Sequence, residues 1–415
     1  MSHLPVRRLP ALQLTVAAAS VLVAFGASAD PNPYYLRAKQ AFTRESNVYR
    51  NVESAEKSDT SSASTLSVGL DQPIGRQRLL ADAYVKHTNY HDESHLDNTG
   101  YGLNVRAALE TVNRLSGGLN YSTSRGLASF ESGTATSRVT EKNMVSQQML
   151  GGQARLGMAS LWVLETGYTW REQEYSAQAF QPQEQESHMF NVGARYRPTD
   201  LISFGVAVRH TDGRIPNFRP GVEDKYDRDD LDFTVSWRPN GLSNFDARLS
   251  RTRTDHELVD ARDFKGFTGS LAYRYRPTGK LSFNAAFVRE TDDETGAFTI
   301  PGLPEEFGDA QLPVQNTTQI NSYRFGIGYQ ATAKIRLNLG LRQSRRKLEE
   351  SFPTGQSGRD RTNVAGLGLD YNISRNWLAG CNYNWEKRRV SSDNRNFSFP
   401  YKAESVGCMA QFALQ

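Results

Sequence analysis

The sequence predicts an all-β protein, a transmembrane antiparallel β-barrel of about 18 strands with short periplasmic turns and long extracellular loops. Apolar and polar residues alternate with period two over most of the chain, and short turn signals alternate with long polar segments. The chain also holds 20 Phe, 18 Tyr and 5 Trp at a mean hydropathy of only −0.59. A barrel explains why many aromatic residues occur together with a low mean hydropathy, because only every second residue faces lipid.

The N-terminus predicts export. Arg7 and Arg8 precede a largely apolar stretch at 12–25, and Ala27-Ser28-Ala29 supplies a cleavage site. The apolar stretch is too short to cross a membrane as a helix. We therefore expect a signal peptide at 1–29 and an outer-membrane barrel at 30–415.

The strands are predicted from alternation. The segments 202–208, 231–237 and 335–341 show it most clearly, and no segment of the mature chain shows the helical period of 3.6. Alternation is blurred at 79–90 and 143–156.

The turn signals set the number of strands. Short turns are expected at 72–75, 112–114, 157–159, 198–200, 239–241, 277–279, 332–334 and 374–376. Long loops are expected at 51–62, 91–98, 126–140, 176–184, 213–228, 255–263, 291–317, 350–360 and 390–399. Eight hairpins, with one strand before them (38–50) and one after (401–415), give eighteen strands, and sixteen is the fallback.

A soluble sandwich or propeller is the alternative fold, but no blade motif recurs along the chain. Tryptophans favour the barrel. Trp162 and Trp377 lie at the turn ends of their strands, and Trp170 and Trp385 lie at the opposite ends. They are expected to form the two aromatic girdles of a membrane barrel.

Charge and motifs exclude several function classes. The 49 basic and 45 acidic residues give +4, or +2 without Arg7 and Arg8, which is too small to indicate nucleic-acid binding. The sequence contains no HExxH, GxSxG or P-loop motif. A barrel hydrolase would need a Ser and a His paired on adjacent strands, and no such pair was identified. We expect no enzyme, metal site or cofactor.

The first hundred residues carry a recognisable pattern. It consists of Glu45-Ser46-Asn47-Val48-Tyr49-Arg50, Ser58-Asp59-Thr60, the run from Gly69 to Arg78, and Leu96-Asp97-Asn98-Thr99-Gly100-Tyr101. Over about residues 40–122 the chain resembles the exopolysaccharide-operon outer-membrane proteins of the EpsL type, within a wider group of β-barrel porins. The resemblance implies that the protein secretes exopolysaccharide across the cell outer membrane, together with a periplasmic polysaccharide-export protein.

The C-terminal segment departs from the pattern of such barrels. Residues 405–412 resemble the signal read by the barrel assembly machinery, but Ala413-Leu414-Gln415 follow where an aromatic residue usually ends the chain. The efficiency of insertion into the outer-membrane lipid is therefore open.

Strand parity predicts which charged residues line the pore. The candidates are Arg106, Arg195, Arg209, Arg248, Arg274, Arg324, Arg336, Arg342, Asp82, Asp232, Asp246 and Asp370, with Glu165 beside them. These charges could pair across strands and stiffen the wall. An arginine excess could also attract anionic cargo. Both interpretations stay open.

Barrel width favours transport, because 16 to 18 strands leave an aqueous lumen. Secretion of exopolysaccharide is the leading expectation. The alternatives are a general or small-sugar diffusion porin and a structural or adhesin barrel. A sugar-selective porin should show a ladder of inward aromatic residues, and these are scarce here.

The longest connection, 291–317, could restrict the pore, since long loops are often functional. Its acidic residues, which could fold onto the arginine-lined wall, are Asp292, Asp293, Glu294, Glu305, Glu306 and Asp309. A mobile surface loop is the equal alternative.

Cys381 and Cys408 are expected to face each other in the last hairpin. The hairpin is centred near residue 395, so facing residues should sum to about 790, and 381 and 408 sum to 789. A disulfide could therefore form in the oxidising periplasm. Free cysteines on the lipid face are the alternative.

Overall fold

The computed structural model describes residues 32–415 apart from 112–113, 131–139, 158–159, 220, 259–261, 292–316, 350–356, 392–397 and 415. The expected signal peptide at 1–29 lies outside the described residues. The six acidic residues expected in the loop after residue 291 also lie outside them.

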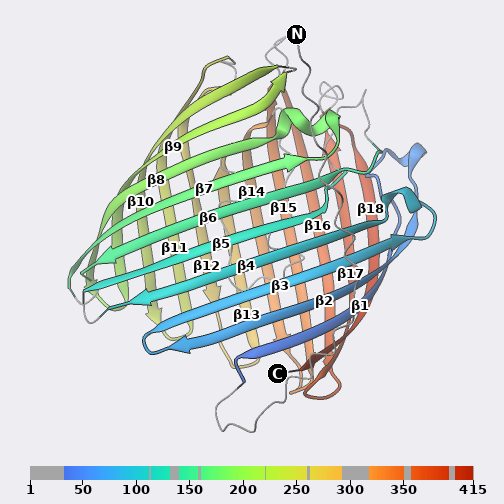
Figure 1. The fold of residues 1–415 in the computed structure, drawn as a ribbon, viewed down its shortest axis with the longest axis horizontal. Coiled ribbons are helices and arrows are strands. Elements are labelled where there is room, and N and C mark those ends of the chain that lie inside the picture. Colours follow the sequence, from blue (N-terminus) through green and yellow to red (C-terminus); the bar gives the residue numbers. More distant parts are fainter. Residues whose placement is uncertain are drawn as a thin grey trace, which may run out of the picture. The chain divides into compact units, whose positions relative to one another are not determined.

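Eighteen strands form one closed antiparallel sheet, which confirms the predicted barrel (Figure 1). Each strand pairs with its sequence neighbours, and β1 pairs with both β2 and β18 to close the wall. The strands are β1 (Tyr34–Glu45), β2 (Asp59–Ile74), β3 (Gln77–Tyr90), β4 (Asn98–Glu110), β5 (Leu115–Leu127), β6 (Met144–Leu156), β7 (Trp162–Tyr175), β8 (Gln185–Thr199), β9 (Ile202–Arg219), β10 (Val222–Asn240), β11 (Ser243–His256), β12 (Phe264–Tyr275), β13 (Leu281–Glu290), β14 (Thr317–Gln330), β15 (Ile335–Glu349), β16 (Ser357–Asn372), β17 (Trp377–Val390) and β18 (Tyr401–Leu414).

The two ends of the barrel differ. We call the end with the short β2–β3, β4–β5 and similar connections the turn end, and the other the loop end. Among the described residues the loop end holds three short 3-10 helices, η1 (Glu53–Ala55), η2 (Ser94–Leu96) and η3 (Gln178–Gln183). Within the same described part of the chain, no helix is long and apolar enough to cross a membrane.

Several expected boundaries were wrong. β2 begins at Asp59, within the loop expected at 51–62, and β16 begins at Ser357, within the loop expected at 350–360. Two further differences concern the first strand and the segment 213–228. The first strand is β1, Tyr34–Glu45, and not 38–50, since the chain leaves the sheet before Arg50, whose φ is 54°. The long loop expected at 213–228 is instead an extended hairpin of β9 and β10. Inward and outward residues still alternate along this hairpin, as the inward-facing Ile215 and Tyr226 show, which are 4% and 1% exposed. The blurred segments are both strands, β3 and β6.

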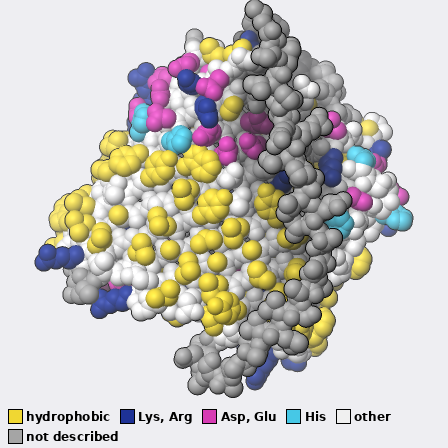
Figure 2. All heavy atoms as spheres, viewed as in Figure 1, with side chains coloured by type: hydrophobic (Ala, Val, Ile, Leu, Met, Phe, Trp, Pro, Cys, Tyr) yellow, Lys and Arg dark blue, Asp and Glu magenta, His cyan; other side chains and the backbone are white. Residues whose placement is uncertain are grey.

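The outer face carries the exposed apolar residues. On β9, for example, Phe204, Val206 and Val208 are 44%, 48% and 60% exposed and alternate with inward small residues. Figure 2 shows such side chains spread over the outer surface, with charged and histidine side chains gathered beyond them. At the turn end, Trp162 packs on Tyr196 with ring centroids 4.9 Å apart. This arrangement is typical of a lipid-facing band with an aromatic girdle.

Candidate functional site

The inner wall of the barrel is the candidate functional site. Every charged residue expected to line the pore occupies an inward position of its strand, alternating with exposed apolar neighbours. Their contacts differ, and three groups can be distinguished.

The first group is centred on Glu165 of β7. Arg195 of β8 donates to both carboxylate oxygens of Glu165 from Nε and Nη2, each at 3.0 Å. Arg155 of β6 places its Nε 3.4 Å from the same carboxylate. The Glu165 side chain remains 24% exposed, so this group faces the lumen. Arg155 was not among the expected residues, because alternation in its strand is blurred.

The second group lies deeper in the wall. Arg209 of β9 donates to Asp232 of β10 at 3.2 Å from Nε and contacts Asp230 at 3.2 Å. Arg228 donates to Asp230 at 2.8 Å, and the hydroxyl of Ser250 donates to Asp232 at 2.5 Å. These side chains are almost fully buried, so they tie β9, β10 and β11 together. Here the wall-stiffening interpretation fits.

Arg228 also reaches the start of the longest connection. Its Nη1 lies 2.6 Å from Oγ1 of Thr291, which is 2% exposed and directly follows β13. The chain therefore leaves β13 toward the inner side of β10. The expected restriction of the pore concerns residues outside the described part and stays a prediction.

The remaining expected residues make varied contacts. Asp82 pairs with Arg37 at 3.2 Å. Arg37 lies outside the predicted first strand and was missed for that reason. Asp246 accepts from Ser236 at 2.6 Å, Asp370 accepts from Asn338 at 3.2 Å, and Arg336 donates to Gln330 at 3.2 Å. Arg106, Arg248, Arg274, Arg324 and Arg342 are inward as well, and Arg342 is 8% exposed.

Small residues give the inner wall of β5–β8 a polar hollow of about 240 Å³. A Cβ at Gly151 would lie 2.4 Å from Oδ1 of Asn120, and one at Gly167 would lie 2.6 Å from Oδ1 of Asn191. These glycines therefore let the two amides lie against the wall. With the Glu165 group beside them, the amides can donate to and accept from hydroxyl or carboxylate groups of a solute.

Inward tyrosines also lie along the wall. Tyr84 of β3 faces Gly102 of β4 in register, and a Cβ at Gly102 would lie 2.3 Å from the Tyr84 ring. Tyr226 covers Gly213 in the same way. An aromatic ring over a facing glycine is a common way to stabilise a glycine in a sheet. The Tyr226 ring is consequently buried against the wall, whereas the Tyr84 side chain stays 39% exposed.

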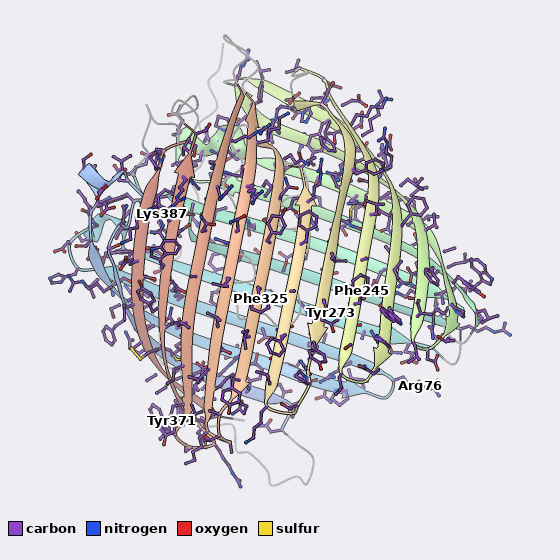
Figure 3. The ribbon with its side chains drawn as sticks, turned by 180° about the vertical axis from the view of Figure 1, so that it is seen from behind. Arg76, Phe245, Tyr273, Phe325, Tyr371 and Lys387 are labelled. Atoms are coloured by element: carbon purple, nitrogen blue, oxygen red, sulfur yellow. A yellow bond between two sulfur atoms is a disulfide. The ribbon has the colours of Figure 1, made fainter. Side chains whose placement is uncertain are left out.

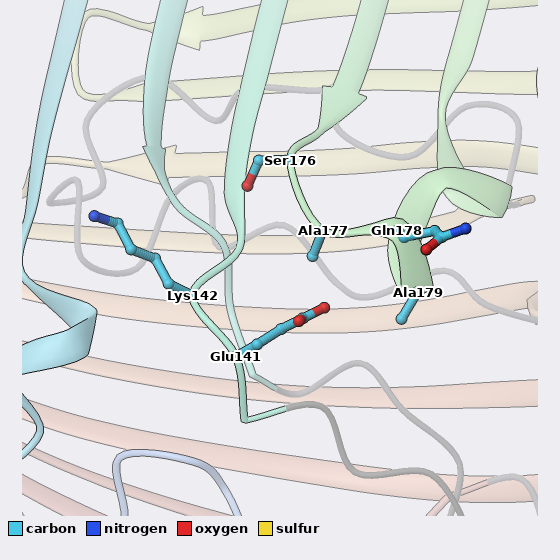
Figure 4. Close-up of a pocket in the computed structure, with 6 residues that line it drawn as sticks. All are labelled: Glu141, Lys142, Ser176, Ala177, Gln178 and Ala179. Atoms are coloured by element: carbon cyan, nitrogen blue, oxygen red, sulfur yellow. The ribbon is translucent and has the colours of Figure 1, made fainter.

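A second hollow, of about 500 Å³, lies at the loop end (Figure 4). The segment 141–142 and the segment 176–179 line it. Glu141 and Lys142 are its charged residues, and the rest of the lining is small or neutral. Nothing in this lining defines a ligand.

The residues of the recognisable pattern make structural contacts. Asn47 is fully buried, and its Nδ2 donates to the carbonyl oxygens of Asn51 at 2.7 Å and Lys402 at 2.9 Å. Its Oδ1 accepts from Asn51 N at 2.9 Å. Arg50 bonds Glu45 and Glu386, the latter at 3.0 Å. This stretch therefore locks the loop after β1 onto β17 and β18 at the seam of the barrel.

Neighbouring pattern residues hold the next loops. Asp59 accepts the backbone N–H groups of Thr60, His91, Asp92 and Glu93. Lys57 and Tyr49 donate to Glu93 at 2.8 and 2.7 Å. The Lys57 hydrogen bond lowers the pKa of Glu93, and burial raises the pKa of Tyr49. The pattern that carries the resemblance thus explains the structure of these loops.

Cys381 and Cys408 face each other in the β17–β18 register, with Cα atoms 4.1 Å apart, and the structure joins them by a disulfide. Both lie on the outer face of the barrel.

No protein-family model and no curated protein matches the chain. Among solved structures, it is similar to OccK2 (OpdF) of Pseudomonas aeruginosa in complex with glucuronate, with a TM-score of 0.49, 12% identity, and 92% of this chain and 98% of that chain covered. OccAB3 of Acinetobacter baumannii gives a TM-score of 0.48 and 9% identity, with 92% and 99% covered. The outer membrane protein OpdK of Pseudomonas aeruginosa gives a TM-score of 0.47 at 10% identity, with 92% of this chain and 98% of that chain covered.

Proposed function

We propose that the protein is an outer-membrane channel through which small hydrophilic solutes diffuse. One observation carries this proposal: an eighteen-stranded closed barrel combines an apolar outer band with an inner wall of small and polar side chains. Barrels of 16 to 18 strands enclose an aqueous channel. In this class the long loops face outward from the cell and the short turns face the periplasm.

The charge of the inner wall supports a preference for anionic solutes. Among the described inward residues of β12–β15 there are five arginines and one carboxylate, that of Glu290. The arginines are Arg274, Arg324, Arg336, Arg342 and Arg346, and of these Arg346 donates to Asp360 of β16 at 3.0 Å. A wall with one dominant sign of charge raises the local concentration of the opposite ion. Small sugar acids combine that charge with hydroxyl groups suited to the hollow of β5–β8.

Solute flux into proteoliposomes tests this function. Glucose, glucuronate and glucosamine have similar size and differ in charge, so swelling rates should follow the order glucuronate, glucose, glucosamine. The variant Arg324→Gln/Arg342→Gln should reduce the difference between the swelling rates in glucuronate and in glucosamine. The control, Arg345→Gln/Arg361→Gln, makes the same change on the outer face of β15 and β16 and should keep it. Swelling no faster than in protein-free liposomes would contradict the proposal.

Secretion of exopolysaccharide remains the second candidate, supported by the sequence resemblance over residues 40–122. It makes a different prediction in cells. If the protein exports polymer, a strain lacking its gene should lose surface polysaccharide and accumulate polymer inside. A diffusion channel predicts unchanged surface polysaccharide and slower uptake of small solutes.

A further inference from the structure

A dense group of cations lies on the outer wall of β15–β17 toward the loop end. We call it the outer basic patch, and its members are Arg345, Lys347, Arg359, Arg361, Lys387 and Arg389. All six occupy outward positions, and all but the half-buried Lys387 are exposed. In Figure 3, Lys387 lies toward the opposite end of the sheet from Tyr371 at the turn end.

The strand register places like charges directly opposite one another. Arg345 of β15 faces Arg361 of β16, and Arg361 faces Arg389 of β17. Lys347 faces Arg359 in the next row. Like charges in directly opposed positions destabilise a sheet. Such rows indicate that the surface is made for an anion.

The outward positions 341–347, 359–365 and 383–389 hold no carboxylate, whereas Glu404 of neighbouring β18 faces outward beside the patch and pairs with Lys402 at 2.5 Å. Along 341–347 of β15, 359–365 of β16 and 383–389 of β17, the outward residues other than the patch are Leu341, Gln343, Asn363, Ala365, Tyr383 and Trp385. Within the described residues, Arg345 donates from Nε to Oε1 of Gln343 at 3.0 Å, and its guanidinium lies 5.7 Å from the centroid of the Tyr323 ring. Both contacts hold the guanidinium in place and leave its charge uncompensated by an acid.

The height of the patch identifies its surroundings. The outward residues below it, Leu337, Leu341, Leu367 and Leu369, are 40–57% exposed and belong to the apolar band. Arg345 follows Leu341 by four residues, which is about 13 Å along a strand. Cations at this height meet the headgroups of the lipid layer whose acyl chains cover the band.

The outer face of β9 and β10, six strands away around the barrel, shows that this charge is local. At the same end, the outer face of β9 and β10 carries Asp212, Asp227 and Asp229 around His210, with His210 Nδ1 2.7 Å from Asp229. A general rule that barrel rims are basic therefore does not explain the patch. Among the described residues, the outer face toward the loop end is therefore not uniformly basic.

We propose that the outer basic patch binds the phosphate groups of a phosphorylated glycolipid of the outer leaflet, whose acyl chains pack on the apolar band of β14–β17. Arginine binds phosphate through two parallel hydrogen bonds. The row formed by Arg345, Arg361 and Arg389 provides three guanidinium groups that can bind in this way. The inference rests on the outer-membrane location of the proposed function and is independent of what passes through the lumen.

The test uses the full mature chain, folded in detergent and titrated with diphosphorylated lipid A in native mass spectrometry. The variant is Arg345→Gln/Arg361→Gln/Arg389→Gln. The control is Arg76→Gln/Arg114→Gln/Arg375→Gln, which removes the same charge from exposed residues at the turn end. Each cation near an anionic surface contributes about a fivefold gain in affinity. The affinity of the patch variant for diphosphorylated lipid A should therefore fall about a hundredfold. The control should stay within about twofold of the parent, because its cations lie far from the patch.

Three outcomes would overturn the proposal: equal binding by parent and patch variant, equal loss in the control, or equal affinity for lipid A from which both phosphates have been removed. If the triple variant does not fold, Arg361→Gln alone should lose about fivefold. Channel conductance of the patch variant is measured in parallel and should equal that of the parent. Failure of lipid binding and failure of the proposed channel are thereby distinguished.

Discussion

Replacing Glu165 by Gln should make the channel more selective for anions. The substitution keeps the shape of the side chain and removes the charge that neutralises Arg195 and Arg155, whose contacts to Glu165 are 3.0 and 3.4 Å long. Two guanidinium groups would then face the lumen beside a neutral amide. Because the side chain is partly exposed to the lumen, water screens the added charge, and the dielectric constant of water applies.

The size of the effect follows from Coulomb's law. A unit charge acts on an ion ~6 Å away, one water layer off the wall, with about 0.7 kcal/mol in bulk water. Salt at 0.1 M, with a Debye length of about 10 Å, lowers this to about 0.4 kcal/mol. That energy doubles the local anion concentration and halves that of cations, so the anion-to-cation permeability ratio should rise about fourfold.

Reversal potentials across a planar bilayer with a salt gradient measure this ratio. Glu172→Gln is the matched control, because Glu172 lies on the same strand but faces outward, where Gln148 donates to it at 3.1 Å. It should leave the ratio unchanged. An unchanged ratio in Glu165→Gln, or an equal shift in both variants, would refute an ion path along this wall.

The remaining predictions concern stability and the disulfide. Asn47→Ala should lower the free energy of unfolding in urea by about 2–4 kcal/mol, because three hydrogen bonds in a buried loop lose their partner. Asn89→Ala, at an exposed strand position, should change it by less than about 0.5 kcal/mol, and equal effects would contradict the role given to Asn47. For Cys381 and Cys408, thiol labelling of unfolded, non-reduced protein should find no reactive thiol. Two labelled thiols per chain would show that the bond does not form.

Much of the fold could be predicted from the sequence, because the strands of a barrel show period-two alternation and the spacing of the turns sets their number. In alternating segments such as 202–208, every second residue faces inward. This rule placed Arg106 and Asp370, which are far apart in the sequence, on the same inner wall. The same arithmetic paired the two cysteines in register. What failed was local. Residues 213–228 are polar in composition, but they continue a hairpin whose inward positions hold Ile215 and Tyr226.

The candidate site was predicted less completely. Parity gives the face of a residue and not its partner, so it did not show that Arg195 binds Glu165 or that Arg209 is held by Asp230 and Asp232. The hollow of β5–β8 depends on which glycines face which amides across three strand pairs, and a single sequence does not contain that register. The pattern around Asn47 was read through its resemblance, whereas its contacts are those of a loop anchor.

Single-channel recording of the purified, folded protein in a planar lipid bilayer tests the central claim most directly. An open eighteen-stranded barrel predicts stepwise conductance that rises with salt concentration and persists when all loops are intact, with anions carrying most of the current. Heat-unfolded protein from the same preparation should give none. Repeated insertion of correctly folded barrels without any conductance step would contradict the account of an aqueous lumen.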